Sequence, residues 1–155
     1  MATGDITIFN QFVDDLANKT HNLKTDTFKL GFITSAVTPA AADTTPMWSV
    51  GSGKDYDGNE VVATGNYTAG GITIGNPTFS FVGGAGKWDD NGTNISLAQH
   101  GSGFTNARWG IIYNDTATNN EAVAFVDFGG DLSEVAGPIS MTWHAGGILI
   151  TTIVP

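Results

Sequence analysis

The chain has 155 residues, a net charge of −9 and no cysteine, so we expect one domain with a hydrophobic core, without disulfides or thiolate metal sites. Its six basic residues are scattered, whereas phosphate binding needs clustered Lys and Arg, which excludes a typical nucleic-acid binder. The sequence holds no run of about 18 apolar residues, so we expect no membrane-spanning helix.

The N-terminal segment predicts a helix of about three turns. Its apolar residues recur at a spacing of three to four, which places one apolar stripe on one face. Asp5 or Thr7 is the expected cap of this helix. Two roles stay open for the stripe, which either packs on the sheet of its own subunit or docks on a neighbouring subunit. The stripe consists of Ile8, Phe9, Phe12, Val13, Leu16 and Ala17.

Residues 27–34 alternate in the manner of a strand with one buried face. From residue 35 to residue 68 the chain is rich in turn-forming residues, and we expect a long loop that crosses a surface or reaches a partner. Trp48 and Tyr56 lie in this loop. Because a loop of this length is unusual in a compact domain, it is a candidate contact region.

The middle of the chain predicts two short strands, at residues 72–74 and 78–82, with Phe79 and Phe81 on one face of the second. A glycine-rich break at residues 83–86 follows, and we expect residues 88–102 to form another loop, which contains Trp88.

The C-terminal third predicts four strands at similar spacing, separated by glycine and asparagine turns. Their ranges are 107–116, 122–128, 139–143 and 148–154, with Gly129 and Gly130 closing the second. Residues 122–126 are apolar on both faces, as in a central strand. The pattern predicts an all-β fold, an antiparallel β-sandwich with a jelly roll as one arrangement. We expect a single domain, 1–155, with an N-terminal helix or arm at 1–22 and the sandwich at 23–155.

No motif assembles a catalytic, metal or cofactor site. Asp55 to Glu60 resembles a calcium loop, but aligning Gly58 at the sixth position puts Gly53 first and Thr64 twelfth, where ligating carboxylates are needed. The segment around Gly83 to Trp88 lacks the first glycine and the Ser or Thr of a phosphate loop. We therefore expect no enzyme, no cofactor and no metal.

The four tryptophans separate into two pairs. Trp109 and Trp143 lie in alternating strands and are expected in the core, whereas Trp48 and Trp88 lie in expected loops, where exposed aromatic side chains anchor contacts. The candidate interface combines the helix stripe with loop aromatics, and its residues are Phe9, Phe12, Val13, Leu16, Trp48, Tyr56 and Trp88.

Five ordered motifs, spanning most of the chain, resemble small virion structural proteins of tailed bacteriophages that are assigned as head decoration or cement proteins. The motifs are residues 9–17 with 21–23, then 25–30, 66–71, 111–116 and 126–129. The resemblance implies a non-enzymatic protein, made in the host cytoplasm, that binds the major capsid protein on the outside of the head and stabilises the shell at symmetric capsomer junctions.

A homotrimer would fit local three-fold junctions of such a shell. We expect the helix and residues 35–68 to contribute to its contacts. Two alternatives remain, a tail tube or fibre protein and a carbohydrate-binding β-sandwich module that uses Trp48 and Trp88.

Overall fold

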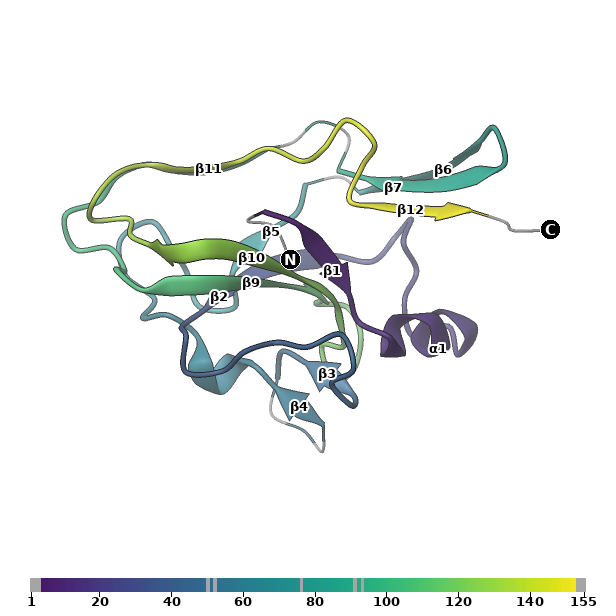
Figure 1. Ribbon diagram of the computed structural model, residues 1–155, viewed down its shortest axis with the longest axis horizontal. Helices are drawn as coiled ribbons and strands as arrows, with labels where there is room; N and C mark the ends of the chain where they lie inside the picture. The colour runs from purple at the N-terminus through teal and green to yellow at the C-terminus, as the bar shows by residue number, and fades with distance from the viewer. Residues whose placement is uncertain are drawn as a thin grey trace.

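The structure is a computed structural model that describes residues 4–49, 51, 53–75, 77–90, 92 and 94–152. In this part of the chain it is mainly β, with antiparallel sheets, one short parallel pair and one α-helix (Figure 1). This architecture confirms the predicted fold class.

A five-stranded antiparallel sheet forms the centre of the molecule. Its strands are, in spatial order, β1 (Ile6–Ile8), β10 (Ala122–Leu132), β9 (Ala107–Asn114), β2 (Phe28–Ile33) and β5 (Ile72–Thr73). Leu30 pairs with Ile112, which pairs with Ala124, and this row contributes to one core cluster. The adjacent row contains Ile111 and Phe125 and contributes to a second cluster. Since alternate residues face opposite sides, both faces of the sheet are buried.

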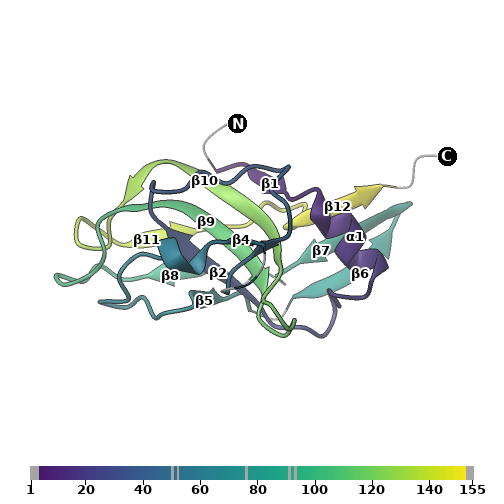
Figure 2. The ribbon, with the colours of Figure 1, turned by 90° about the horizontal axis from the view of Figure 1, so that it is seen from below.

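Two smaller sheets lie over the first face of the central sheet (Figures 1 and 2). One pairs β8 (Ile95–Leu97) with β11 (Ile139–Met141), and the other, which we call the distal sheet, has the order β12 (Leu149–Thr152), β7 (Ala85–Asp89), β6 (Thr78–Val82). Trp88 of β7 meets Phe28 of β2 edge to face, with ring centroids 4.7 Å apart. The two smaller sheets therefore form a layer beside the central sheet.

The segment around residues 45–60 covers the second face of the central sheet. It contains the parallel pair β3 (Pro46–Met47) and β4 (Lys54–Asp55) and the 3₁₀ turn η1 (Asp57–Asn59). Trp48 stacks on Tyr113 at 5.1 Å, and Tyr56 packs near Phe9 at 5.9 Å. The expected partner-reaching loop is therefore largely occupied in closing the core of its own subunit.

The N-terminal helix is shorter than the spacing predicted. Helix α1 spans Gln11–Ala17, and its N-cap is Asn10, not Asp5 or Thr7. Ile8 belongs to β1 and pairs with Ala124. Residues 6–8 pair with the edge of β10, which gives hydrogen-bond partners to backbone groups that would have none in the first turn of a helix. The apolar spacing therefore overestimated the length of the helix.

Most of the expected strands are present. The predicted ranges 27–34, 78–82, 107–116, 122–128 and 139–143 correspond to β2, β6, β9, β10 and β11, whereas 88–102 is not a loop because it holds the end of β7 and all of β8. Gly129 and Gly130 lie within β10, at a register shift between Asp127 and Leu132, and do not close the strand. The last strand is described to Thr152, so residues 153 and 154 of the expected range lie outside the described residues.

Candidate functional site

Five of the seven candidate interface residues belong to the core. Phe9, Phe12, Trp48, Tyr56 and Trp88 are each at most 4 % exposed. Their assignment to a contact surface was wrong, because the aromatic side chains of the loop and of β7 fill the two faces of the central sheet. The helix stripe packs mainly on its own subunit.

Two candidate residues of the helix remain at the surface. Val13 is 71 % exposed, and Leu16, one turn further on, is partly buried. Residues three apart are neighbours on a helix, so Val13 and Leu16 lie on the same side of α1. The surviving part of the expected interface is therefore this side of the helix.

The distal sheet carries the larger exposed apolar group. Phe79, Trp88 and Leu149 are opposite one another in register and share the inner face, which points toward the core. Phe81 lies on this same face two residues further along β6, past the end of the core, and is 62 % exposed. Val82 and Ile150 lie on the outer face and are 73 % and 55 % exposed.

A tight turn holds this hairpin beyond the rest of the molecule. Gly83 and Gly84 both have positive φ, of 61° and 85°, as a two-residue turn between twisted strands requires. Phe81 pairs with Gly86, which has no side chain, and Val82 pairs with Ala85, which has only a methyl group, so they have little to pack against. The end of the hairpin therefore presents apolar surface to solvent.

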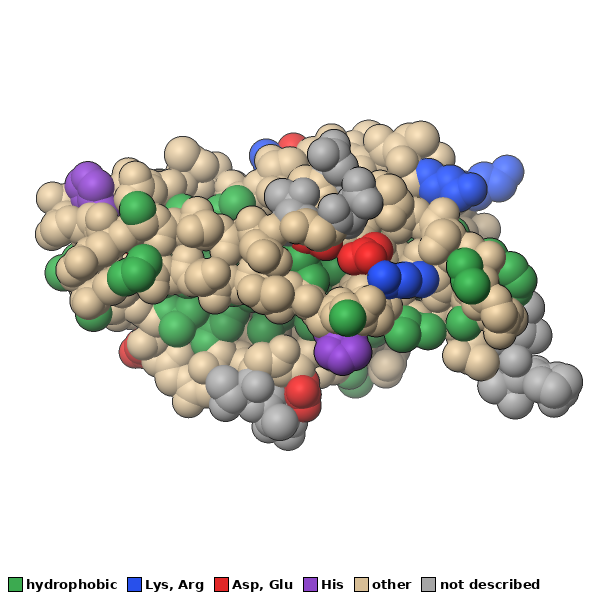
Figure 3. Space-filling model, turned by 90° about the horizontal axis from the view of Figure 1, so that it is seen from above, with side chains coloured by type: hydrophobic (Ala, Val, Ile, Leu, Met, Phe, Trp, Pro, Cys, Tyr) green, Lys and Arg blue, Asp and Glu red, His purple; other side chains and the backbone are tan. Residues whose placement is uncertain are grey.

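A cleft of about 510 Å³ lies between the inner face of the distal sheet and the C-terminal end of α1. We call it the α1–β6 cleft; both ribbon views place α1 beside the distal sheet (Figures 1 and 2). Its lining includes Leu16, Lys19, Leu23, Lys24, Phe79 and Thr151. In Figure 3 most of the basic side chains in view lie toward the end of the molecule that carries this sheet, where several hydrophobic side chains are also exposed.

Buried polar groups fix the helix side of the cleft. His21 also lines it, is 5 % exposed, and its Nδ1 lies 3.2 Å from Nδ2 of Asn114 at the end of β9. The same amide group donates to Asp26 at 2.8 Å. Burial lowers the pKa of His21, although Glu121 and Asp26 act in the opposite direction. A neutral ring is what an amide donor facing Nδ1 requires.

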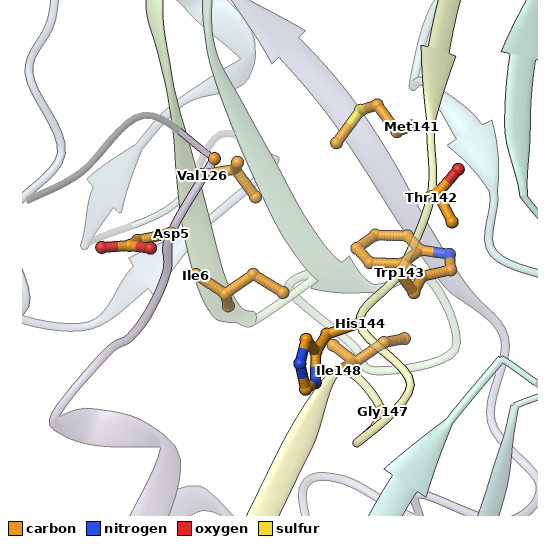
Figure 4. A pocket seen from close by; sticks show the side chains of 10 residues that line it. Asp5, Ile6, Val126, Met141, Thr142, Trp143, His144, Gly147 and Ile148 are labelled. Atoms are coloured by element: carbon orange, nitrogen blue, oxygen red, sulfur yellow. The ribbon is translucent and has the colours of Figure 1, made fainter.

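A second cleft, of about 430 Å³, lies between β1 and the segment that joins β11 to β12. Figure 4 shows Trp143 and Ile148 facing Ile6 and Val126 across it. Trp143 is only partly buried, so it is not the fully enclosed core residue that the strand pattern predicted, whereas Trp109 is buried as expected.

The described residues hold no group of three or more His, Asp or Glu side chains arranged for a metal ion. The histidines lie apart: His21 is in the α1–β6 cleft, His144 is in the second cleft, and His100 follows β8. Asp57 has the most strongly shifted pKa among the carboxyl groups, since burial and its hydrogen bond with Asp55 raise this pKa to about 6. Asp55 ends β4 and Asp57 begins η1, both in the segment that covers the second face of the central sheet.

Comparison with family models, with curated proteins and with solved structures found no match to this chain. Within the described residues, no helix has the length and apolar character needed to cross a membrane. The fold and the two clefts therefore define a mainly β protein with a projecting apolar hairpin, and the functional argument depends on that surface.

Sequence inspection missed Phe81, Val82 and Ile150 as surface residues. Phe81 and Val82 are consecutive, so they point to opposite faces of a strand, and they directly precede a two-glycine turn. Apolar residues on both faces of a hairpin end cannot both be buried by one underlying layer. This combination was the signal that could have identified them.

Proposed function

We propose that this protein is a bacteriophage head decoration protein that binds the major capsid protein on the outside of the shell through the distal sheet and the adjoining α1–β6 cleft. The single observation that carries the proposal is the projecting hairpin, on which Phe81 and Val82 remain 62 % and 73 % exposed. The resemblance of the ordered sequence motifs to head decoration proteins supports the same conclusion.

The physical argument concerns the cost of leaving such side chains in water. Fully burying a Val or Phe side chain contributes about 1.5–3 kcal/mol. β6 and β12 hold no charged residue, and the two charged residues of the sheet, Lys87 and Asp89 on β7, pair with each other. A cement protein needs this combination, a closed core with an apolar contact surface outside it, because it stabilises the shell by being buried between capsomers.

The test is binding to heads of the parent virus from which this protein has been removed. Purified wild-type protein is expected to sediment with the heads and to raise their resistance to heat. Phe81→Ser is expected to lose most of this binding while its unfolding free energy changes by no more than about 0.5 kcal/mol, since the side chain is exposed. Val62→Ser is the matched control, because Val62 is also apolar, 70 % exposed, and outside the distal sheet.

Two results would contradict the proposal. Wild-type protein that binds isolated tails and not heads would assign it to the tail tube or fibre alternative. Heads that bind wild type, Phe81→Ser and Val62→Ser equally would keep the decoration role and exclude the distal sheet as the contact.

A further inference from the structure

Only some of the basic side chains of this acidic chain form ion pairs with the described residues. Three of the six form ion pairs: Lys29 with Asp115, Lys87 with Asp89, and Arg108 with Asp127. The other three, Lys19, Lys24 and Lys54, form none with the described residues. Two of these three unpaired cations, Lys19 and Lys24, line the α1–β6 cleft.

Two carboxylates close in sequence to these lysines have other hydrogen-bond partners. Asp26 accepts hydrogen bonds from the backbone N–H of Asn22 at 2.7 Å and from Asn114. Asp15 is 8 % exposed and accepts a hydrogen bond from Gln11. Lys19 and Lys24 are exposed, so their ammonium groups are available to an outside partner.

The position of Lys19 is costly for a lysine. The N–H of Thr20 bonds to the carbonyl of Asp15 and that of Lys19 to the carbonyl of Leu16, which closes α1 with a Schellman motif. Lys19 has a φ of 62° in this motif, where glycine is normally favoured. Lys19 thus places a cation at the rim of an apolar cleft although the backbone conformation at this position is unfavourable for a lysine.

We propose that the α1–β6 cleft binds an acidic segment of the capsid partner, with a bulky apolar side chain seated against Leu16, Leu23 and Phe79 and its carboxylates paired with Lys19 and Lys24. The complementarity has two parts, since the floor of the cleft is apolar and its rim is positive in a protein of net charge −9. This inference rests on the proposed function, because it names the chemistry of the partner at the same surface.

A peptide measurement tests the chemistry without heads. The probes are acetyl-Phe-Asp-Glu amide and its uncharged analogue acetyl-Phe-Asn-Gln amide, titrated into the ¹⁵N-labelled full chain. Amide shifts confined to residues 16–24, 79 and 151, with weaker binding of the uncharged peptide, support the inference. Equal binding of the two peptides, or shifts elsewhere, overturns it. Dodecanoate that binds the cleft when neither peptide does also overturns it, in favour of a lipid.

Three lysine variants connect the cleft to the head. Lys19→Gly removes the cation and is expected to fold at least as stably, because glycine suits the positive φ. Lys19→Gly and Lys24→Gln are each expected to weaken peptide and head binding by about threefold, the size of an exposed ion pair. Lys54→Gln, which neutralises the third unpaired lysine outside the cleft, is expected to leave both unchanged.

The outcomes separate the two proposals. If wild type binds the acidic peptide and not the heads, the decoration role fails and the cleft assignment stands. If wild type binds heads and the cleft variants bind them as well as Lys54→Gln does, the cleft assignment fails and the decoration role stands.

Discussion

At the scale of single residues, the position of Trp48 depends on the absence of a side chain opposite it. The indole ring lies over Gly31 in β2, and a Cβ added at Gly31 would overlap three of its ring atoms. The ring also stacks on Tyr113, with an interplanar angle of 3°. Gly31 therefore allows the segment around residues 45–60 to close on the second face of the central sheet.

Gly31→Ala is expected to lower the unfolding free energy by about 1–3 kcal/mol, because the added methyl group overpacks a buried site and displaces Trp48. Chemical denaturation followed by tryptophan fluorescence measures this loss. Gly58→Ala is the control, since a Cβ at Gly58 would meet nothing within 4 Å. Equal denaturation midpoints for the two variants would show that Trp48 does not rest on Gly31.

The same residues explain why the candidate interface was predicted poorly. Trp48 and Tyr56 stand among glycines and polar residues, a local pattern that resembles an exposed loop. Their burial depends on the second face of a sheet formed by strands far away in sequence, such as β9 and β10. Local spacing describes the neighbours along the chain, whereas burial is decided by neighbours in space.

At the scale of elements, α1 is attached to the central sheet by Phe12 and by the polar contacts of His21. The ring of His21 stacks on Phe12, with centroids 5.5 Å apart, and lies beside Asn114 of β9. Protonation of this ring would place a positive charge among buried groups and would turn Nδ1 into a second donor facing an amide donor, although Nε2 lies 3.8 Å from a carboxylate oxygen of Asp15. Attachment of the helix should therefore depend on pH.

The wild-type protein is expected to have a higher unfolding free energy than His21→Gln at pH 7. This difference is expected to become smaller as the pH falls from 7 to 5. The folded pKa of His21 lies below its ordinary value of 6.5, so the unfolded chain takes up the proton first and stability decreases as pH falls below about 6.5. Each unit of that pKa difference corresponds to about 1.4 kcal/mol. Urea denaturation of both proteins at several pH values measures the effect, and a difference independent of pH would contradict it.

Strand elements were more predictable from sequence than their partners. The C-terminal strands have clear alternation and turn residues, and four of them were located. β1, β7 and β8 were missed. β1 and β8 have three residues each, which gives too short a pattern, and they pair with β10 and β11, which lie elsewhere in the chain. β7 begins inside the expected glycine-rich break at residues 83–86. The sequence indicated two residues of the candidate site, Val13 and Leu16. It did not indicate the α1–β6 cleft.

At the scale of the whole molecule, the proposed role on an icosahedral shell predicts assembly into symmetric units. Three-fold junctions suit a homotrimer, and Val13 is a large exposed apolar residue of the helix that was expected to contribute to subunit contacts. We expect sedimentation equilibrium of the wild-type protein to give three times the mass of one chain. Val13→Asp is expected to give the mass of a single chain, because it places a charge in the contact.

Phe81→Ser provides the comparison for this measurement, since it changes the proposed capsid contact and should leave the trimer intact. A wild-type protein that remains a single chain at the concentrations used for head binding would contradict the trimer. It would leave the decoration role to be tested by the binding experiment alone.

The order of synthesis decides which parts of the fold can form first. β1 at residues 6–8 can pair only after β10, which starts at Ala122, has left the ribosome. Helix α1 follows β1 and is anchored by Asn114, and the α1–β6 cleft still lacks one wall until Thr151 is added. A nascent chain that has not yet reached Thr151 therefore lacks this cleft and could not use it to bind the proposed partner.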